Sequence, residues 1–459
     1  MTSAPVRPRA SFGETLAVYL RPRVLIVLFL GFSAGLPLAL SGSTLLYWAR
    51  EVGVDLKTVG LFALVGTPYT IKFLWAPLID AFDVPLLARR LGRRRGWLVF
   101  AQLVLMAAIV ILGNCDPWAA PAFAAFGGLL VATASATQDI VIDAFRIESL
   151  PESEQAAGMA SYVAAYRVGM LASSAGALYV VSGFEMLGFT KQGGWSASYF
   201  VMALLVLIGL VTTLLATEPA KSEAAERIHS GMKAIDRLFT TVAGAFTDFF
   251  LREGLLVAVV VLVFVVLFKL TDALAGVMTG PFTVDLGFSR NEYATIIKGV
   301  GLAALLIGGF TGGYIAKAFP LAASLWIGGI LQALANLAFA WQAVLGRDLA
   351  WLTFAITVEN FTSAIGTVMF VAYLSAICKN PLHTATQYAL LTALSAVGRT
   401  YLSAPAGYIA ATTGWTSFFV ICTLAGIPGL LLLAWLQHRG HFTKLEQPRL
   451  EESAAAARG

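Results

Sequence analysis

The sequence predicts an all-α integral membrane protein with twelve transmembrane helices in two six-helix halves. Composition, the spacing of apolar runs and a weak internal repeat predict this fold. Of the 459 residues, 58% are hydrophobic and only 12% are charged, whereas soluble domains carry about 25% charged residues. The mean hydropathy of +0.79 fits a chain surrounded mostly by lipid. A net charge of +5 would suit nucleic acid or an anionic membrane surface, and the positions of the charges favour the membrane.

Twelve apolar runs are each long enough to cross a bilayer as a helix of about 20 residues. They must be helical, because lipid offers no partner to an unpaired backbone amide. We expect an N-terminal bundle over 24–216 and a C-terminal bundle over 254–437, separated by a polar linker at 217–253 and flanked by polar segments at 1–23 and 438–459. The expected spans are 24–48, 57–82, 96–113, 119–145, 154–183, 195–216, 254–280, 289–317, 321–343, 349–377, 383–412 and 414–437.

The basic residues give the orientation, because Lys and Arg collect on the cytoplasmic side of a membrane. They crowd the segment before the first span, the connection after the second, the central linker and the tail, whereas the alternate loops hold few. The sequence therefore predicts that both termini are cytoplasmic. This orientation requires an even number of spans.

Two pairs of short motifs repeat between the halves. Trp48–Gly53 ends the first span and Thr283–Gly287 ends the seventh, at an offset of 234 between their final glycines. Ala175–Tyr179 lies in the fifth span and Ala406–Tyr408 in the eleventh, at an offset of 231. Such offsets suggest a duplicated six-helix unit, although chance similarity between apolar helices is the alternative. Two parallel six-helix repeats resemble the major facilitator architecture.

The connection after the second span supports the same resemblance. Ala76–Phe82 carries an acid and is followed by the basic cluster Arg89–Gly96, which looks like the major facilitator loop between helices two and three. An acid at the inner mouth could pair with a basic loop in one conformation and release it in the other. Ordinary cytoplasmic enrichment in arginine is the alternative explanation. The predicted cytoplasmic gate comprises Asp80, Arg93, Arg94 and Arg146.

Ionisable residues inside spans need a reason, because each costs roughly 2.5–3.5 kcal/mol on insertion scales. Asp139 and Asp143 are four residues apart on the fourth span and share one helical face. Asp139 lies about two turns inside the boundary, where a low dielectric favours a neutral carboxyl. We predict that both residues couple transport to protons. The alternative is a static belt of ion pairs with Arg146 at the helix end.

Three cations, Lys72, Arg167 and Arg399, fall near mid-membrane without a close acid on their own helices. They could pair across helices with Asp139, Asp272 or Glu359, or they could face a carboxylated substrate. Lys269 and Asp272, three residues apart, could simply neutralise each other.

The first span contains several glycines, a proline and the polar run Ser41–Thr44. A helix broken in this way can bend and let a ligand approach its backbone. Nearby rings could stack on sugars, with an interfacial aromatic belt as the alternative. The predicted substrate-binding residues are Gly35, Tyr69, Lys72, Trp75, Gln138, Arg167, Asp272, Glu359 and Arg399.

Three segments resemble one family, the AmpG muropeptide permeases: Gly31–Pro37, Pro68–Asp80 and Ala136–Arg146. The resemblance is strong through the N-terminal half and weaker beyond the central linker. Acetyl-CoA transporters share the outline more loosely. Some members of the family continue past the twelfth helix, whereas this chain turns polar at Gln437.

The resemblance implies an inner-membrane importer driven by the proton gradient, with N-acetylglucosaminyl-anhydro-N-acetylmuramyl peptides as cargo. In such bacteria, uptake of these anhydromuropeptides serves cell-wall recycling and feeds β-lactamase induction. Amides and rings at Gln138, Tyr69 and Trp75 would suit the amino sugars, and Lys72, Arg167 and Arg399 would suit the peptide carboxylates. We expect protons and the lipid bilayer as further partners, a monomer, no nucleic acid, no metal and no cofactor.

Two other functions compete with this one. The first is a related transporter of another anionic or sugar-containing solute. The second is a membrane-embedded enzyme or sensor, which would need a catalytic set at one interface. The four histidines, His229, His383, His438 and His441, lie in expected cytoplasmic segments and form no ligand pattern. The sequence therefore favours a transporter over an enzyme.

Overall fold

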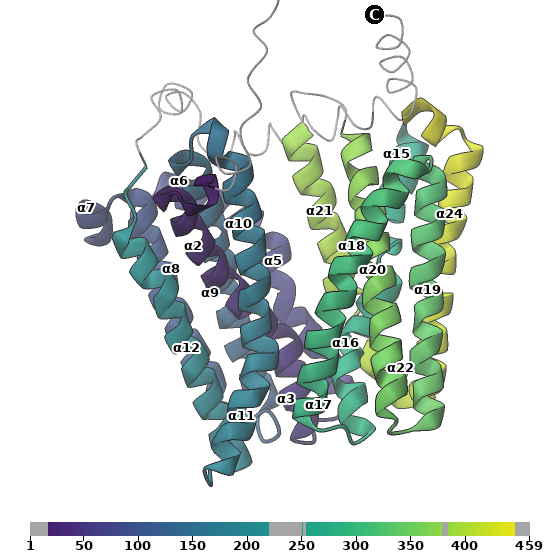
Figure 1. Ribbon diagram of the computed structural model, residues 1–459, viewed down its shortest axis with the longest axis horizontal. Helices are drawn as coiled ribbons and strands as arrows, with labels where there is room; N and C mark the ends of the chain where they lie inside the picture. The colour runs from purple at the N-terminus through teal and green to yellow at the C-terminus, as the bar shows by residue number, and fades with distance from the viewer. Residues whose placement is uncertain (1–16, 220–249, 251–253, 379–383, 446–459) are drawn as a thin grey trace, which may run out of the picture.

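The computed structural model describes residues 17–219, 250, 254–378 and 384–445. Most of the predicted N-terminal segment, central linker and C-terminal tail lies outside these residues. The described chain is helical, and its helices fall into two groups that stand side by side (Figure 1). Helices α2 to α12 form the N-terminal half, and α15 to α24 form the C-terminal half.

The N-terminal half follows the predicted order of spans. Its elements are α2 (Pro22–Ala39), η2 (Leu40–Thr44), α3 (Leu45–Glu51), α4 (Leu56–Leu61), η3 (Phe62–Gly66), α5 (Thr67–Ile71), η4 (Lys72–Leu74), α6 (Ala76–Ala81), α7 (Leu87–Leu91), α8 (Arg93–Gly113), α9 (Pro121–Ser149), α10 (Glu152–Leu171), η5 (Ala172–Gly176), α11 (Ala177–Met186) and α12 (Lys191–Leu215).

The C-terminal half repeats this plan. Its elements are α15 (Leu255–Leu267), α16 (Leu270–Asp285), α17 (Arg290–Tyr293), η6 (Ala294–Val300), α18 (Gly301–Ala318), α19 (Leu321–Leu345), α20 (Leu349–Ile377), α21 (Thr384–Tyr401), α22 (Ala406–Thr413), α23 (Trp415–Leu424) and α24 (Ile427–His438).

Ten continuous helical stretches in the described chain are long and apolar enough to cross a membrane. The other two predicted spans, 57–82 and 383–412, are built from shorter pieces. In the first of these, α5 begins at Thr67, with Pro68 in its first turn, directly after the 3-10 segment η3. In the second, α22 begins directly after Pro405. Proline has no N–H group to donate within a helix, so both breaks follow from the sequence.

The predicted bend in the first span is confirmed. Gly42 interrupts it with non-helical angles (φ −101°, ψ −109°) inside the π-helical segment η2. Two further π-helical segments, η5 and η6, interrupt the fifth and eighth spans. Segments of this kind occur frequently at functional sites.

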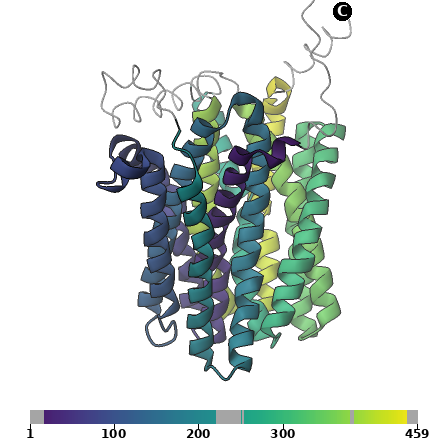
Figure 2. The same cartoon turned by 60° about the vertical axis from the view of Figure 1, so that its left-hand side comes forward.

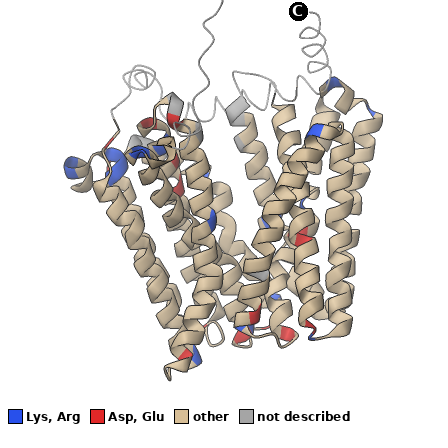
Figure 3. Ribbon diagram, viewed as in Figure 1, with Lys and Arg blue, Asp and Glu red and all other residues tan. Residues whose placement is uncertain are grey.

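The two halves meet at one end and diverge at the other (Figure 1), and the long helices of both halves run between these two ends (Figure 2). We call the end where Glu51 and Asp285 terminate their helices the distal end. The proximal end carries α7, the start of α2 and the end of α24. Charged residues gather at the two ends, while the middle of the bundle is largely uncharged (Figure 3). This distribution is that of a multi-pass membrane protein, because charge is costly in the hydrocarbon region.

Candidate functional site

A central cavity lies between the two halves. It consists of two adjoining pockets, of about 310 and 220 Å³, which share Ala39, Ser43, Met170 and Gly276 in their walls. The N-terminal half contributes residues of α2, η2 and α10, and the C-terminal half contributes residues of α16, α20 and α21. Because both halves form its walls, a relative motion of the halves would change access to this cavity.

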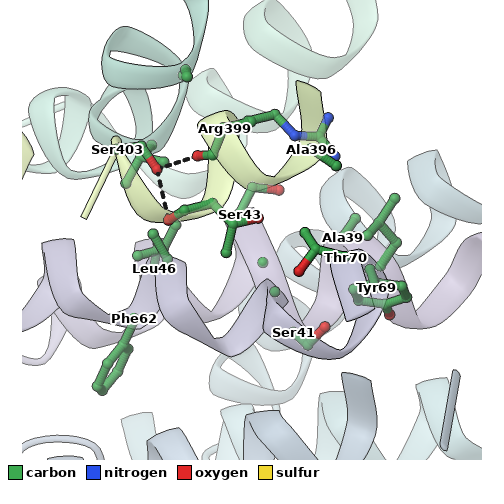
Figure 4. A pocket seen from close by; sticks show the side chains of 18 of the residues that line it. Ala39, Ser41, Ser43, Leu46, Phe62, Tyr69, Thr70, Ala396, Arg399 and Ser403 are labelled. Carbon is green, nitrogen blue, oxygen red and sulfur yellow. Dashed lines mark hydrogen bonds between the residues drawn. The ribbon is translucent and has the colours of Figure 1, made fainter. Parts of the chain in front are cut away.

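Two arginines enter this cavity from opposite halves. Arg167 on α10 lines the smaller pocket and Arg399 on α21 lines the larger one. Both side chains are exposed, and within the described chain neither has an acidic group at ion-pair distance. They lie 232 positions apart, which matches the offsets of the repeated motifs. Arg399 faces the wall that carries Ser41 and Tyr69 (Figure 4).

Asp272 and Glu359, two predicted site acids, also line the cavity. Asp272 accepts hydrogen bonds from Lys269 Nζ at 2.8 Å and Ser363 Oγ at 2.7 Å. Lys269 also donates to Thr367 at 2.9 Å. Lys269 and Asp272 therefore form an ion pair, one of the two alternatives that the sequence left open. Glu359 accepts from Asn360 Nδ2 at 2.8 Å.

Asp139 and Lys72 form the cross-helix pair that the sequence offered as one possibility. Lys72 Nζ lies 3.8 Å from Asp139 Oδ2, and their side chains are 34% and 10% exposed. The other carboxyl oxygen of Asp139, Oδ1, is buried and has no hydrogen-bond partner among the described residues. Oδ2 of Asp139 thus faces a cation, while Oδ1 remains available to accept hydrogen bonds.

Tyr69 separates this pair from the central cavity. Its ring lines the larger pocket (Figure 4), while its hydroxyl oxygen is buried. Asp139 is close enough to interact electrostatically with this hydroxyl. Tyr69, predicted as a substrate-binding residue, therefore lies on the wall of the central cavity.

Three predicted substrate residues occupy other places. Gln138 is fully buried, and its amide atoms find no partner in the part of the chain that the structure describes. Trp75 donates its indole N–H to Thr137 Oγ1 at 3.2 Å. A side chain at Gly35 would clash with the backbone carbonyl of Tyr166, so this glycine allows α2 and α10 to approach closely. None of the three lines the central cavity, and helix packing accounts for Gly35.

The predicted gate residues at the proximal end are held within the N-terminal half. Arg94 is 5% exposed and donates to Glu148 from Nε at 3.0 Å and Nη2 at 2.5 Å. The Glu218 carboxylate accepts from the backbone N–H groups of Arg94 and Arg95 and so caps α8.

Two other members of the predicted site also lie at this end. Arg146 Nη2 lies 3.7 Å from Asp143 Oδ1 on the same helix, and the Asp143 side chain is half exposed. This arrangement matches the static belt of ion pairs that the sequence left open. Arg93 begins α8, whereas the side chain of Asp80 lies outside the described ones.

Sequence reasoning missed a charged cluster at the distal end. Arg290 Nε pairs with Glu51 Oε1 at 2.5 Å, and its two terminal nitrogens donate to Glu185 at 2.5 and 2.9 Å. Arg50 Nε pairs with Asp285 Oδ1 at 2.5 Å. Each of these pairs joins the two halves.

The repeat held a signal for the distal cluster. Arg50 and Asp285 belong to the two matching motifs that end the first and seventh spans. Parallel repeats place the ends of equivalent spans on the same side of the membrane. Opposite charges at these two positions could therefore have been expected to meet.

Comparison with known proteins agrees with this architecture. The family model of the Major Facilitator Superfamily matches residues 27–401. The chain is 36% identical to the anhydromuropeptide permease of Escherichia coli K12, over 97% of this chain and 86% of that protein. It is 33% identical to a transporter named AmpG 4 in Rickettsia conorii, over 90% of this chain and 96% of the relative.

Solved structures share the fold at low identity. The inward-open xylose transporter XylE of E. coli aligns with a TM-score of 0.62 at 13% identity, over 89% of this chain and 94% of that one. A POT family transporter in complex with a thioalcohol-conjugated peptide gives 0.63 at 13% identity, over 91% and 96%.

The relatives are permeases and transporters rather than enzymes, which agrees with the predicted class. The three segments that resemble the AmpG family all lie within the matched region. The chain therefore belongs to the Major Facilitator Superfamily and, within it, to the AmpG family of permeases.

Proposed function

We propose that this protein imports anhydromuropeptides, N-acetylglucosaminyl-anhydro-N-acetylmuramyl peptides, across a bacterial inner membrane by proton-coupled alternating access. The name of the E. coli relative supports this cargo. The proximal end, which carries the basic run from Arg89 to Arg95, faces the cytoplasm because basic residues collect there. The cavity then serves a cytoplasm-facing state.

The paired arginines of the cavity carry the proposal. Peptide carboxylates bind well to guanidinium groups, which can donate two parallel hydrogen bonds. Arg167 and Arg399 are exposed toward the cavity, and Asp272 is already engaged by Lys269. Because one arginine belongs to each half, a bound dianion would link the halves and favour their rearrangement.

The same cavity suits a sugar. Ser41, Ser43 and Thr400 place hydroxyl groups on its walls, and Asn360 adds an amide. The Tyr69 ring forms part of the same surface. An amino sugar needs hydrogen-bonding groups together with an apolar or aromatic face, and these residues offer both.

Asp139 and Lys72 support the proton coupling. Protonation of Asp139 would leave Lys72 without its counter-charge and would change which state of the N-terminal half is favoured. Inward movement of one proton is favoured by about 2.3 kcal/mol per 100 mV. One such site therefore suffices to drive accumulation.

The test is uptake of a labelled anhydromuropeptide into proteoliposomes, with and without an inward proton gradient. We expect gradient-driven uptake by the wild type and its loss in Asp139→Asn. Arg167→Gln and Arg399→Gln should each weaken cargo binding by about tenfold or more, because each removes a charge-assisted pair. Arg347→Gln, at an exposed distal position, is the matched control and should bind cargo normally.

Other outcomes would change the assignment. If the folded wild type takes up no anhydromuropeptide but transports another anionic solute, the cargo proposal fails and a related transporter remains. Gradient-driven uptake by Asp139→Asn would keep the cargo and remove Asp139 from the coupling path. Normal binding by both arginine variants would contradict the role of the cavity cations.

A further inference from the structure

We infer that Tyr69 relays protons between the central cavity and Asp139, with the hydroxyl groups of Ser41 and Ser135 and bridging water completing the path. The inference rests on the proposed coupling role of Asp139 and assigns it a route. Tyr69 was predicted from the sequence only as a surface for sugar stacking. Its position in the structure points to a second role.

Tyr69 occupies the wall between the two sites. Its ring lines the larger pocket of the cavity, near Ser41 and opposite Arg399 (Figure 4). Its hydroxyl is buried behind that wall and lies close to the hydroxyls of Ser135 and Ser41. The residue therefore contacts the cavity with one face and the interior of the N-terminal half with its polar end.

Behind the wall lies a group of three buried side-chain oxygens. Tyr69 Oη, Ser135 Oγ and Asp139 Oδ1 have no hydrogen-bond partner among the residues with a described position. Ser135 and Asp139 are four residues apart on α9, so they lie on one face of that helix. Ser135 is fully buried and Asp139 is 7% exposed.

Buried polar atoms without protein partners are commonly satisfied by ordered water, which typically makes about three hydrogen bonds. Here such water would connect Tyr69 Oη, Ser135 Oγ and Asp139 Oδ1. Ser41 lines the cavity and lies close to Tyr69 Oη. Its hydroxyl donates to the Pro37 carbonyl at 2.8 Å, and in the relay it would rotate to donate to Tyr69 Oη.

Other groups near Asp139 do not provide this connection. Lys72 faces Oδ2, the opposite carboxyl oxygen, and Asp143 lies one turn further along α9. Tyr162 and Tyr166 on α10 interact with Asp139 electrostatically, and neither lines the central cavity. Among the described groups that face this carboxyl, Tyr69 combines a buried hydroxyl with a ring on the cavity wall.

Transfer along the path leaves every intermediate group neutral. A proton from cavity water binds Ser41 Oγ while the original Ser41 proton moves to Tyr69 Oη and the original Tyr69 proton moves to the next water or to Ser135. That group in turn passes a proton to Asp139 Oδ1, which becomes neutral. Tyr69 ends the step as an ordinary phenol, so no tyrosinate is formed.

Tyr69→Phe tests the relay, because it keeps the ring on the cavity wall and removes the hydroxyl. We expect gradient-driven uptake to fall by roughly tenfold or more, as for loss of a proton-transfer group. Counterflow of labelled against unlabelled cargo needs no net proton movement and should stay within about twofold of the wild type. Tyr162→Phe is the matched control and should retain both activities.

Two results would overturn the relay. Gradient-driven uptake by Tyr69→Phe at the wild-type rate would show that the hydroxyl is dispensable. Loss of counterflow together with driven uptake would place Tyr69 in cargo binding rather than in proton transfer.

A second measurement works without any cargo and separates this inference from the proposed function. After a pH jump, time-resolved infrared spectroscopy of the purified protein follows the carboxyl band that Asp139→Asn removes. A slower appearance of this band in Tyr69→Phe, with Tyr162→Phe unchanged, would support the relay even if the cargo proposal fails. An unchanged rate in Tyr69→Phe would overturn it.

Discussion

The two ends of the bundle use ion pairs in different ways. At the distal end, Arg290 and Arg50 bind acids across the boundary between the halves. At the proximal end, Arg94 binds Glu148 within the N-terminal half, and Arg21 binds Glu154, also within that half. The distal pairs therefore hold the halves together, whereas these proximal pairs stabilise one half and leave its partner free to move.

The distal ion pairs oppose opening of this end because they are largely buried. The side chains of Arg290 and Glu51 are 9% and 13% exposed, and a charge left alone at such a site is strongly destabilising. Tyr47 and Tyr293 pack across the same boundary with ring centres 4.6 Å apart. Opening the distal end must separate all of these contacts. Position relative to the boundary, rather than the mere presence of an ion pair, therefore decides which charges control access.

The largest effect is expected from Arg290→Met. This change leaves Glu51 and Glu185 without their shared cation and should destabilise the closed distal end by about 3–5 kcal/mol. Spin labels at the exposed positions Met186 and Leu349, in opposite halves near the distal end, should report a longer distance. Unchanged distances in a folded Arg290→Met protein would contradict the inference that this cluster holds the distal end closed.

A charge reversal tests whether Arg50 and Asp285 interact directly across the boundary. Asp285→Asn should weaken distal closure by about 2–3 kcal/mol, since it leaves Arg50 unpaired at a partly buried site. The double variant Arg50→Asp with Asp285→Arg restores opposite charges and should recover much of the closed population in the same distance measurement. If the loss of distal closure in the double variant equals the sum of the losses in Arg50→Asp and Asp285→Arg, the two residues do not interact as described.

The proximal counterpart should change stability rather than conformation. Arg94→Ala removes both bonds to Glu148 and should lower the free energy of unfolding by about 1–2 kcal/mol, seen as a lower thermal midpoint. Spin labels at Ile147 and Leu255, exposed positions near the proximal end, should keep their wild-type distance. A clear change in that distance would instead support the conformational gate predicted from the sequence.

The smallest effect is expected at the rim of the distal end. Lys57 Nζ lies 5.2 Å from the ring centre of Tyr408 in the other half, and exposed cation–π contacts contribute about 0.5–1 kcal/mol. Lys57→Ala should shift the distal equilibrium by about two- to fivefold. Lys57→Arg keeps a cation over the ring and should match the wild type, and an equal shift in both variants would exclude the contact as the cause.

Much of the site was predictable because ionisable residues in apolar spans are conspicuous. Asp139, Lys72, Arg167 and Arg399 stand out against their surroundings in the sequence, and the structure places the first two together and the last two in the cavity. Gln138 and Gly35 were less predictable. In a span that is apolar on every side, periodicity does not tell which face meets the cavity and which meets a neighbouring helix.

The sequence by itself determined the membrane setting, the order of the spans, the break of the first span near Gly42, and the two-half repeat. These properties depend on local composition and on short segments of chain, which apolar length and backbone chemistry control directly. Only the tertiary structure decided that Arg290 bridges Glu51 and Glu185, and that Tyr69 stands between the cavity and Asp139. Such contacts join residues far apart in the chain, and the packing of whole helices against one another sets their geometry.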